Sequence, residues 1–239
     1  MSALAAAEAA AYNWADQTRM REARNYFAWQ YRLAAPYLGP RVIEIGCGIG
    51  NFTWWLRDRQ VAAVDPDPAC LRELELRLPA MAGLRTVRAA AGEGQLPVLA
   101  AADSCIALNV LEHIGDDRRA LAEMGALVRP GGRVILLVPA FAALYGRVDS
   151  QLGHCRRYRR RGLAALAAAA GLRVERLHYV NRLGFFAWWL NARAGRAAQS
   201  PRQIALFDSL APALERLENR LGWALPWGQS LFAVLRRGE

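Results

Sequence analysis

The chain has 239 residues, 54% of them hydrophobic, which suits one α/β domain with a sizeable core. Its net charge of +10 resembles that of a nucleic-acid-binding protein, but all 31 basic residues are arginine, and this bias together with the abundant alanine points to GC-rich coding instead. We find no secretory signal, no apolar run of the roughly 18–20 residues that cross a bilayer, and no CxxC pair among four cysteines, so we expect a cytoplasmic protein without a zinc site or disulfide framework.

Residues 3–37 are predicted to form two helices that end near Pro36 or Gly39. From residue 41 onward, short apolar segments alternate with segments of helical periodicity, which predicts a parallel sheet covered by helices on both faces. The continuous apolar run at 134–138 agrees, because parallel strands are buried on both sides. Strands are expected at 41–45, 61–64, 84–88, 104–108 and 133–138, and helices at 51–59, 68–78 and 117–128.

The pattern changes after a glycine turn at 130–132 and the strand that follows it. Residues 139–160 are irregular and end in a cluster of arginines. The elements expected beyond them are a helix at 162–170, a strand at 172–180, helical stretches at 183–196 and 203–221, and a final strand at 230–236. We therefore expect a single domain over 1–239, in which 1–38 form a helical cap and 139–228 form loops and helices on one side of the site.

The first predicted strand ends in a glycine loop, 46–50, that precedes a predicted helix. Glycines allow tight turns and close backbone approach, so such a loop is typical of nucleotide sites, although plain connectors also use it. Asp65 lies nineteen residues after Gly46, at the end of the second strand, where an acidic side chain can accept hydrogen bonds from two ribose hydroxyls. Asn51 stands where a dinucleotide fingerprint needs its third glycine, which disfavours a nicotinamide-dependent reductase.

Five segments, in order and at the right spacing, resemble the motifs of the class I methyltransferases that depend on S-adenosylmethionine (SAM). They are the first strand and glycine loop at 44–51, the end of the second strand at 64–67, and the later segments 92–97, 109–114 and 127–132. The resemblance implies an α/β fold, a three-layer Rossmann-like sandwich. Its sheet would have seven mostly parallel strands with the last one antiparallel, an N-terminal helical cap, and a helical insertion before the last strand.

The same resemblance implies a cofactor site for SAM, with S-adenosylhomocysteine as the product and no metal. The methionine part would be held by Glu44 and the loop with Gly46, Cys47 and Gly48; the ribose by Asp65 beside Pro66; the adenine by Gly92 and Glu93; and the sulfonium would lie near Asn109 and Val110. Alternatives stay open for three of these groups. Asp65 is also suited to capping a helix, Glu93 to solvent, and the pair Glu112 and His113 to shaping the loop.

Methyl transfer from a sulfonium is an in-line displacement, so the protein mainly aligns the two substrates and excludes water. A hydroxyl acceptor also benefits from a general base. The loop 144–158 resembles that of a small-acceptor branch of the family, and its His154 is our candidate base, with Tyr145 and Arg157 as further catalytic candidates. Arg157 is suited to clamping a carboxylate or phosphate of the acceptor, and the alternatives are a backbone-ordering role for His154 and a solvated arginine cluster.

We therefore predict a methyltransferase that acts on a small-molecule acceptor, with a hydroxyl of a natural product, sugar or lipid-linked compound favoured over nitrogen or carbon. A nucleic-acid methyltransferase is disfavoured, because 109–112 lacks the Asn/Asp-Pro-Pro-aromatic signature of base amino-group methylation. A SAM-binding protein without activity is a further alternative. The aromatic-rich stretch 183–196 is predicted to cover the pocket, with peripheral membrane contact as the alternative, and we expect a monomer or homodimer.

Overall fold

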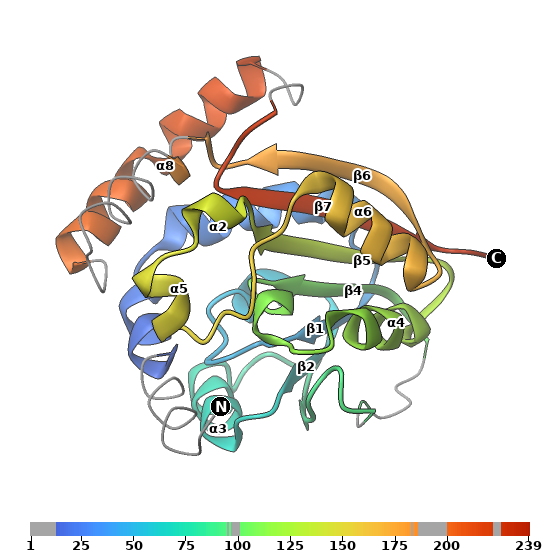
Figure 1. The fold of residues 1–239 in the computed structure, drawn as a ribbon. Helices are drawn as coiled ribbons and strands as arrows, with labels where there is room; N and C mark the ends of the chain where they lie inside the picture. The colour runs from blue at the N-terminus through green and yellow to red at the C-terminus, as the bar shows by residue number, and fades with distance from the viewer. Residues whose placement is uncertain (1–12, 95, 97–100, 183, 186–199, 222–225) are drawn as a thin grey trace.

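The computed structural model describes residues 13–94, 96, 101–182, 184–185, 200–221 and 226–239, and its centre is a seven-stranded sheet (Figure 1). The strands are β1 (Arg41–Ile45), β2 (Gln60–Asp65), β3 (Leu84–Arg88), β4 (Ala102–Leu108), β5 (Val128–Pro139), β6 (Leu172–Val180) and β7 (Ser230–Arg237). Their order is β3-β2-β1-β4-β5-β7-β6, and only β7 runs antiparallel to its neighbours. This arrangement confirms the predicted fold class.

Side chains that alternate along the strands build one core on each face of the sheet. In β5, Val134, Leu136 and Val138 point into one core, and Ile135 and Leu137 into the other. The helices α4 (Asp117–Leu127) and α6 (Arg160–Ala169) cover the first face. The second face is covered by α2 (Arg24–Ala34), α3 (Pro68–Arg77) and the 3-10 helix η2 (Thr53–Leu56). The central strands are therefore buried on both sides, as their apolar sequences predicted.

Two helices on the carboxyl side of the sheet strands begin at carboxylate caps. The side chain of Asp67 accepts a hydrogen bond from the Ala69 N–H at 2.8 Å, and Pro68 follows as the first residue of α3. At α4, the Asp116 carboxylate accepts from the Arg119 N–H at 2.9 Å. The caps fix where α3 and α4 begin, beyond the carboxyl ends of β2 and β4.

The N-terminal segment and the long helix α8 (Pro201–Leu221) lie side by side, although they are far apart in the sequence (Figure 1). Asp208 of α8 accepts a hydrogen bond from the Tyr26 N–H at 2.8 Å, at the start of α2. About two turns further along both helices, Arg32 pairs with Glu215, with Nε 2.8 Å from Oε1. Residues 13–20 are also helical, and η1 (Ala35–Tyr37) ends the segment. Together these helices form one wall beside the sheet.

Three local predictions differ from the structure. The helix predicted at 51–59 is wrong: only Thr53–Leu56 are helical, as 3-10 helix η2, because neighbouring aromatic and β-branched residues disfavour an α-helix. The turn at 130–132 lies inside β5, as a bulge where the register slips between Val128 and Arg133. The irregular stretch 139–160 contains η4 (Ala142–Leu144) and the short helix α5 (Arg147–Gln151).

The helical stretch predicted at 183–196 lies almost wholly outside the described residues, as do residues 3–12. Among the helices that the structure describes, none combines the length and the apolar character needed to span a bilayer.

Candidate active site

A cavity of about 1280 Å³ opens at the carboxyl edge of the sheet, where the strand order reverses between β1 and β4. Small-molecule sites commonly enclose roughly 300–1,000 Å³, so this cavity has room for two ligands. All ten residues predicted to bind the cofactor line it: Glu44, Gly46, Cys47, Gly48, Asp65, Pro66, Gly92, Glu93, Asn109 and Val110. His154 and Arg157 also line it, whereas Tyr145 is not among the described lining residues.

The glycine loop after β1 passes close to the loop after β4. Gly46 has φ +70°, and a Cβ at this position would lie 2.4 Å from Cγ2 of Val110. A side chain at residue 46 would therefore be strained by its backbone conformation and would push the two loops apart. Glycine here lets β1 and β4 present their ends to the same cavity.

Asp65 connects the glycine loop to the start of α3. One carboxylate oxygen accepts from the Gly48 N–H at 2.9 Å, and the other accepts from the Asp67 N–H at 2.9 Å. Each oxygen has a second lone pair, so the buried carboxylate can still accept from a pair of ligand hydroxyls. Burial raises the pKa of Asp65, and the two backbone donors oppose that rise.

Glu44 lies in β1 with only 5% of its surface exposed. Burial, with a smaller contribution from the nearby Asp65 carboxylate, raises the pKa of Glu44 to about 8. Its Oε2 atom has no hydrogen-bond partner among the described residues. A buried oxygen without a partner is costly, so this atom is suited to a ligand that brings a donor, above all a cationic one.

The far end of the cavity is held by α4. Glu123 accepts hydrogen bonds from the Gly92 N–H at 2.7 Å and from the Gly94 N–H at 2.8 Å. This clamp fixes the loop after β3, and the exposed Glu93 between the two glycines lines the cavity. Asn109 follows β4 with φ +56°, an uncommon conformation for a residue other than glycine, and one that is enriched at functional sites.

On the other side of Asn109 lies a network centred on Asp149. This carboxylate is fully buried and lies 2.8 Å from Nδ1 of His154. Arg157 donates to both of its oxygens, from Nε at 2.7 Å and from Nη2 at 3.0 Å, and the Gly146 N–H adds a fourth bond. Although burial acts in the opposite direction, the bonds from His154 and Arg157 hold the pKa of Asp149 below its ordinary value.

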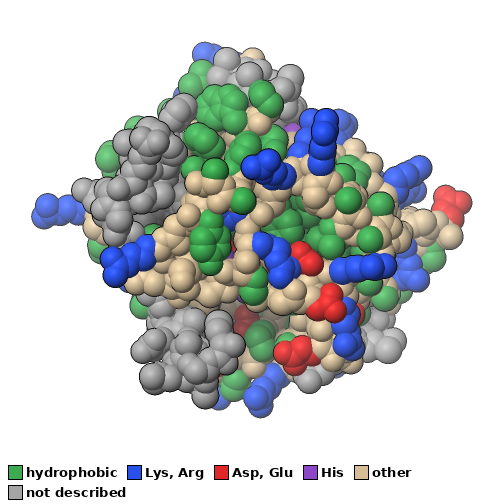
Figure 2. Space-filling model, viewed as in Figure 1, with side chains coloured by type: hydrophobic (Ala, Val, Ile, Leu, Met, Phe, Trp, Pro, Cys, Tyr) green, Lys and Arg blue, Asp and Glu red, His purple; other side chains and the backbone are tan. Residues whose placement is uncertain are grey.

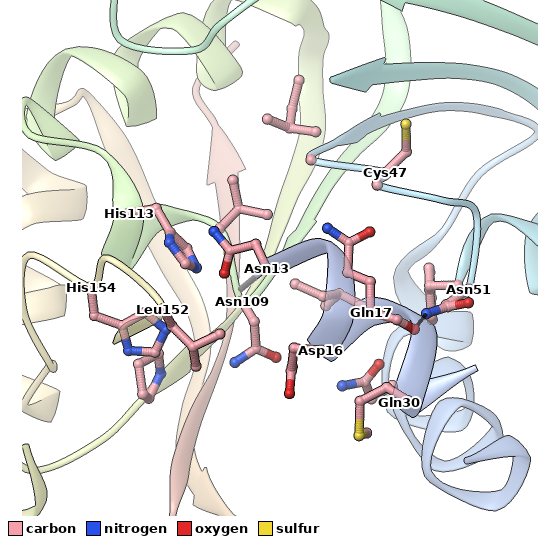
Figure 3. A pocket seen from close by; sticks show the side chains of 18 of the residues that line it. Asn13, Asp16, Gln17, Gln30, Cys47, Asn51, Asn109, His113, Leu152 and His154 are labelled. Atoms are coloured by element: carbon pink, nitrogen blue, oxygen red, sulfur yellow. Dashed lines mark hydrogen bonds between the residues drawn. The ribbon is translucent and has the colours of Figure 1, made fainter. Parts of the chain in front are cut away.

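Because an ionised carboxylate only accepts hydrogen bonds, the proton of a neutral His154 lies on Nδ1 and the lone pair on Nε2. Figure 3 shows His154 and His113 on one side of the cavity and Cys47, Gln17 and Asn51 on the other, with Asn109 and Asp16 between them. The histidines therefore lie across the cavity from the glycine loop. A group bound between the two sides would meet both.

Arg157 and Tyr145 contact the loop of His154. The bidentate clamp expected of Arg157 grips Asp149 of the protein itself, and its Nη1 donates to the Ala140 carbonyl at 3.2 Å. The Tyr145 hydroxyl donates to the His154 carbonyl at 2.7 Å. Both side chains thus position His154, and their catalytic roles stay predictions.

Several residues of the cavity were missed by the sequence analysis. Gln17 lies in the helical segment 13–20. Its side-chain Oε1 accepts a hydrogen bond from the Ile49 N–H at 3.0 Å, and its backbone carbonyl accepts one from Asn51 Nδ2 at 2.8 Å. Such a contact between distant segments leaves no local signal in the sequence. The sequence analysis also missed the residues of α8 that line the cavity. The apolar ones among them are Ile204, Leu206, Phe207, Leu210 and Leu214.

The fold also brings together three side chains that could ligate a metal, Glu112, His113 and His154. No metal was expected from the sequence. Burial lowers the pKa of His113 to about 4, so its ring is neutral at physiological pH.

Comparison with known proteins gives a consistent result. A methyltransferase domain family matches residues 14–177. An uncharacterized methyltransferase of Mycobacterium sp. strain JLS is 33% identical over 129 residues, which are 53% of this chain and 49% of that protein. The chain thus spans about half the length of this relative.

Two solved structures share the fold. One is the complex of a Haloferax volcanii methyltransferase with the Trm112 methyltransferase activator, with TM-score 0.65, 16% identity and coverage of 97% of this chain and 96% of that one. The other is phosphoethanolamine N-methyltransferase 2 of Haemonchus contortus in complex with SAM, with TM-score 0.61, 17% identity and coverage of 89% and 52%. At these identities the likeness concerns the fold alone.

Proposed function

Because this chain belongs to the methyltransferase domain family, we propose that it transfers a methyl group from SAM to a hydroxyl of a small-molecule acceptor. The observation that carries the proposal is that all ten predicted cofactor residues, which come from four separate motifs, line one cavity. The volume of the cavity supports two bound molecules, a cofactor and an acceptor.

The residues present fit SAM. The unpartnered oxygen of Glu44 suits the ammonium group of the methionine part, and the free lone pairs of Asp65 suit the two ribose hydroxyls. Both Glu93 and Asn109 line the cavity, and we assign Glu93 to the adenine amino group and Asn109 to the sulfonium end. When bound, SAM supplies an activated methyl group.

Transfer requires the acceptor oxygen to lie in line with the methyl group and to lose its proton. The oxygen–methyl bond forms as the carbon–sulfur bond breaks, and the electron pair of that bond stays on sulfur. We assign the proton to Nε2 of His154, because Asp149 holds the other ring nitrogen and stabilises the imidazolium that results. Arg157 keeps Asp149 ionised and is a positioning residue.

The walls of the cavity support an acceptor with an apolar part. Phe207, Leu210 and Leu214 of α8 line one side together with Tyr26 and Phe27 of α2, and the ring centroids of Tyr26 and Phe207 lie 6.0 Å apart. Such a surface suits an aromatic or lipid-like compound better than a free sugar. On the face shown in Figure 2, the basic side chains of the described residues are dispersed instead of gathered in one stripe, which supports a small acceptor over nucleic acid.

The test has two stages. Calorimetry should show that the chain binds SAM, and a panel of phenolic, lipid-linked and amine acceptors should reveal transfer of labelled methyl from SAM. His154→Ala should keep the affinity for SAM but lower turnover of a hydroxyl acceptor by about 100-fold or more, because general-base catalysis is lost. His178→Ala is the matched control, because this third histidine lies in β6 and is not a described lining residue.

A chain that fails to bind SAM would refute the proposal. Turnover that is unchanged in His154→Ala would remove the proton-acceptor role. Activity on amines alone would replace oxygen by nitrogen as the acceptor atom, because a neutral amine needs no base.

A further inference from the structure

Three potential metal ligands meet at the edge of the cavity. Glu112 and His113 belong to the 3-10 helix η3 (Leu111–His113) after β4, and His154 follows α5. Each of the three side chains offers one ligand atom, and these three atoms all lie within 4.8 Å of one another. The two imidazole rings are 4.6 Å apart between centroids and perpendicular to each other, at 89°. Two segments forty residues apart thus direct a carboxylate and two imidazoles to one point.

The carboxylate is ready to bind a cation. Glu112 has no exposed surface, and its Oε2 has no hydrogen-bond partner among the described residues. Its other oxygen receives only a long hydrogen bond, from Nδ2 of Asn109 at 3.4 Å. A fully buried carboxylate without an arginine or two good donors is unusual, and a bound cation would satisfy it.

The imidazole of His154 is oriented by a second partner through its other nitrogen. Nδ1 of His154 is held by the buried Asp149, whose Oδ1 lies 2.8 Å away. Metal-binding histidines almost always show this arrangement, in which a carboxylate or carbonyl fixes the tautomer and leaves the other nitrogen free for the metal. The Arg157 clamp in turn fixes Asp149.

We propose that Glu112, His113 and His154 bind one divalent transition-metal cation. Two imidazoles and one carboxylate suit Zn²⁺, Fe²⁺ or Mn²⁺, and three protein ligands leave coordination positions open. Metal–ligand distances of about 2.0–2.2 Å require small side-chain rotations to bring the three ligand atoms closer than they are here. Both histidines line the cavity, so the open positions are accessible to an acceptor.

The role of the cation rests on the proposed function. An acceptor hydroxyl that binds an open position has its pKa lowered, as water does on such metals. Its proton leaves to solvent, the oxygen forms its bond to the methyl carbon, and the electron pair of the broken carbon–sulfur bond stays on sulfur. In the metal-loaded protein Nε2 of His154 is then a ligand, and His154 is the proton acceptor only when the cation is absent.

Metal binding can be measured without SAM or acceptor. Protein without an affinity tag is stripped with a chelator and titrated with Zn²⁺, Mn²⁺ and Co²⁺ by calorimetry, and Co²⁺ binding is also followed by its visible absorption. At least one cation should bind with a stoichiometry of one. His113→Ala and Glu112→Gln should each weaken binding by at least about 10-fold, because they remove a ligand. Circular dichroism checks that both variants are folded.

Two controls test the position of the site. His178→Ala removes a histidine outside the cluster, and Cys155→Ser removes an exposed thiol whose sulfur lies 3.6 Å from the His113 carbonyl oxygen. Both should bind the cation as the unchanged chain does. Absence of binding, or equal binding by His113→Ala, would overturn the site.

The outcomes separate this inference from the proposed function. Chelated protein that binds SAM and transfers methyl groups as fast as metal-loaded protein would refute the role of the cation alone. Protein that binds the cation at this cluster but does not bind SAM would refute the proposed function alone.

Discussion

Glu44 and Asp65 are buried carboxyl groups in the same wall of the cavity, but their surroundings differ. Asp65 receives two backbone hydrogen bonds, whereas Glu44 has an oxygen without a partner. Burial raises the pKa of Glu44 to about 8, so at neutral pH this residue carries a proton while the site is free of ligand. A cationic ligand group beside Glu44 therefore displaces that proton.

The first residue-scale prediction concerns stability. The raised pKa means that folded protein holds the Glu44 proton between about pH 4.5 and 8, whereas unfolded chain has released it. Glu44 therefore reduces the free energy of unfolding progressively as pH rises through this window, by at most about 1.4 kcal/mol per pH unit. Urea unfolding of Glu44→Gln should show stability close to that of the unchanged chain at pH 5 and a relative gain at pH 8. A difference that does not vary with pH would contradict the raised pKa.

A second residue-scale prediction concerns the cofactor. Asp65→Asn keeps the size of the side chain but removes its charge and places an N–H₂ group against one of two backbone donors. Loss of charge-assisted hydrogen bonds should weaken SAM binding by about 10- to 100-fold, measured by calorimetry. Asp58→Asn, at an exposed position between η2 and β2, serves as the matched control. Equal affinities of the two variants would remove Asp65 from the site.

At the scale of elements, the short helix α5 is anchored by its one buried carboxylate. Arg157→Ala would leave Asp149 buried and without its bidentate partner. Removing one partner of such a pair typically destabilises a protein by about 3–5 kcal/mol, which should appear as a lower midpoint of urea unfolding. Arg159→Ala, two residues away at an exposed position, should change stability by less than about 0.5 kcal/mol. A small effect of Arg157→Ala would show that the loop reorganises around Asp149.

Elements with strong patterns were predictable from the sequence. The strands follow from continuous apolar runs, and α8 was expected at 203–221 and lies at Pro201–Leu221. The helix predicted at 51–59 is wrong because a strand followed by a glycine loop usually continues into an α-helix. Here Thr53, Trp54 and Trp55 favour the tighter 3-10 helix instead. The short helix α5 has too few residues to show periodicity.

In the site, too, some residues could be predicted from the sequence and others could not. That the ten predicted cofactor residues share one cavity could be anticipated, because they lie in ordered motifs at strand ends, such as Asp65 after β2. The contacts of Gln17 with the glycine loop and of Glu123 with the loop after β3 join separate elements, so spacing along the chain gives no sign of them. The cluster of His113 and His154 was hidden for the same reason.

At the scale of the whole molecule, the cavity is closed by helices from both parts of the chain that flank the sheet. Asp208→Ala removes the hydrogen bonds that the Asp208 carboxylate accepts from Asn25 Nδ2 and from the Tyr26 N–H, and keeps the one that its backbone carbonyl accepts from Asn25. We expect α8 to open more often, which should raise the KM for an acceptor by about 3- to 10-fold and speed hydrogen exchange in α8, with little change in SAM affinity. Arg216→Ala, at an exposed position of the same helix, is the control. An unchanged KM would mean that α8 does not limit acceptor binding.

The place of β7 in the sheet has a consequence for folding in the cell. This strand lies between β5 and β6 but is synthesised after both of them. While the ribosome is still making residues 200–229, β5 presents an unpaired edge to solvent and β6 has no partner strand in the sheet, and such edges pair readily with other chains. The sheet becomes continuous only when β7 inserts between them. Translation that stalls before residue 230 should therefore yield aggregates, even though the motifs of the cofactor site are already complete.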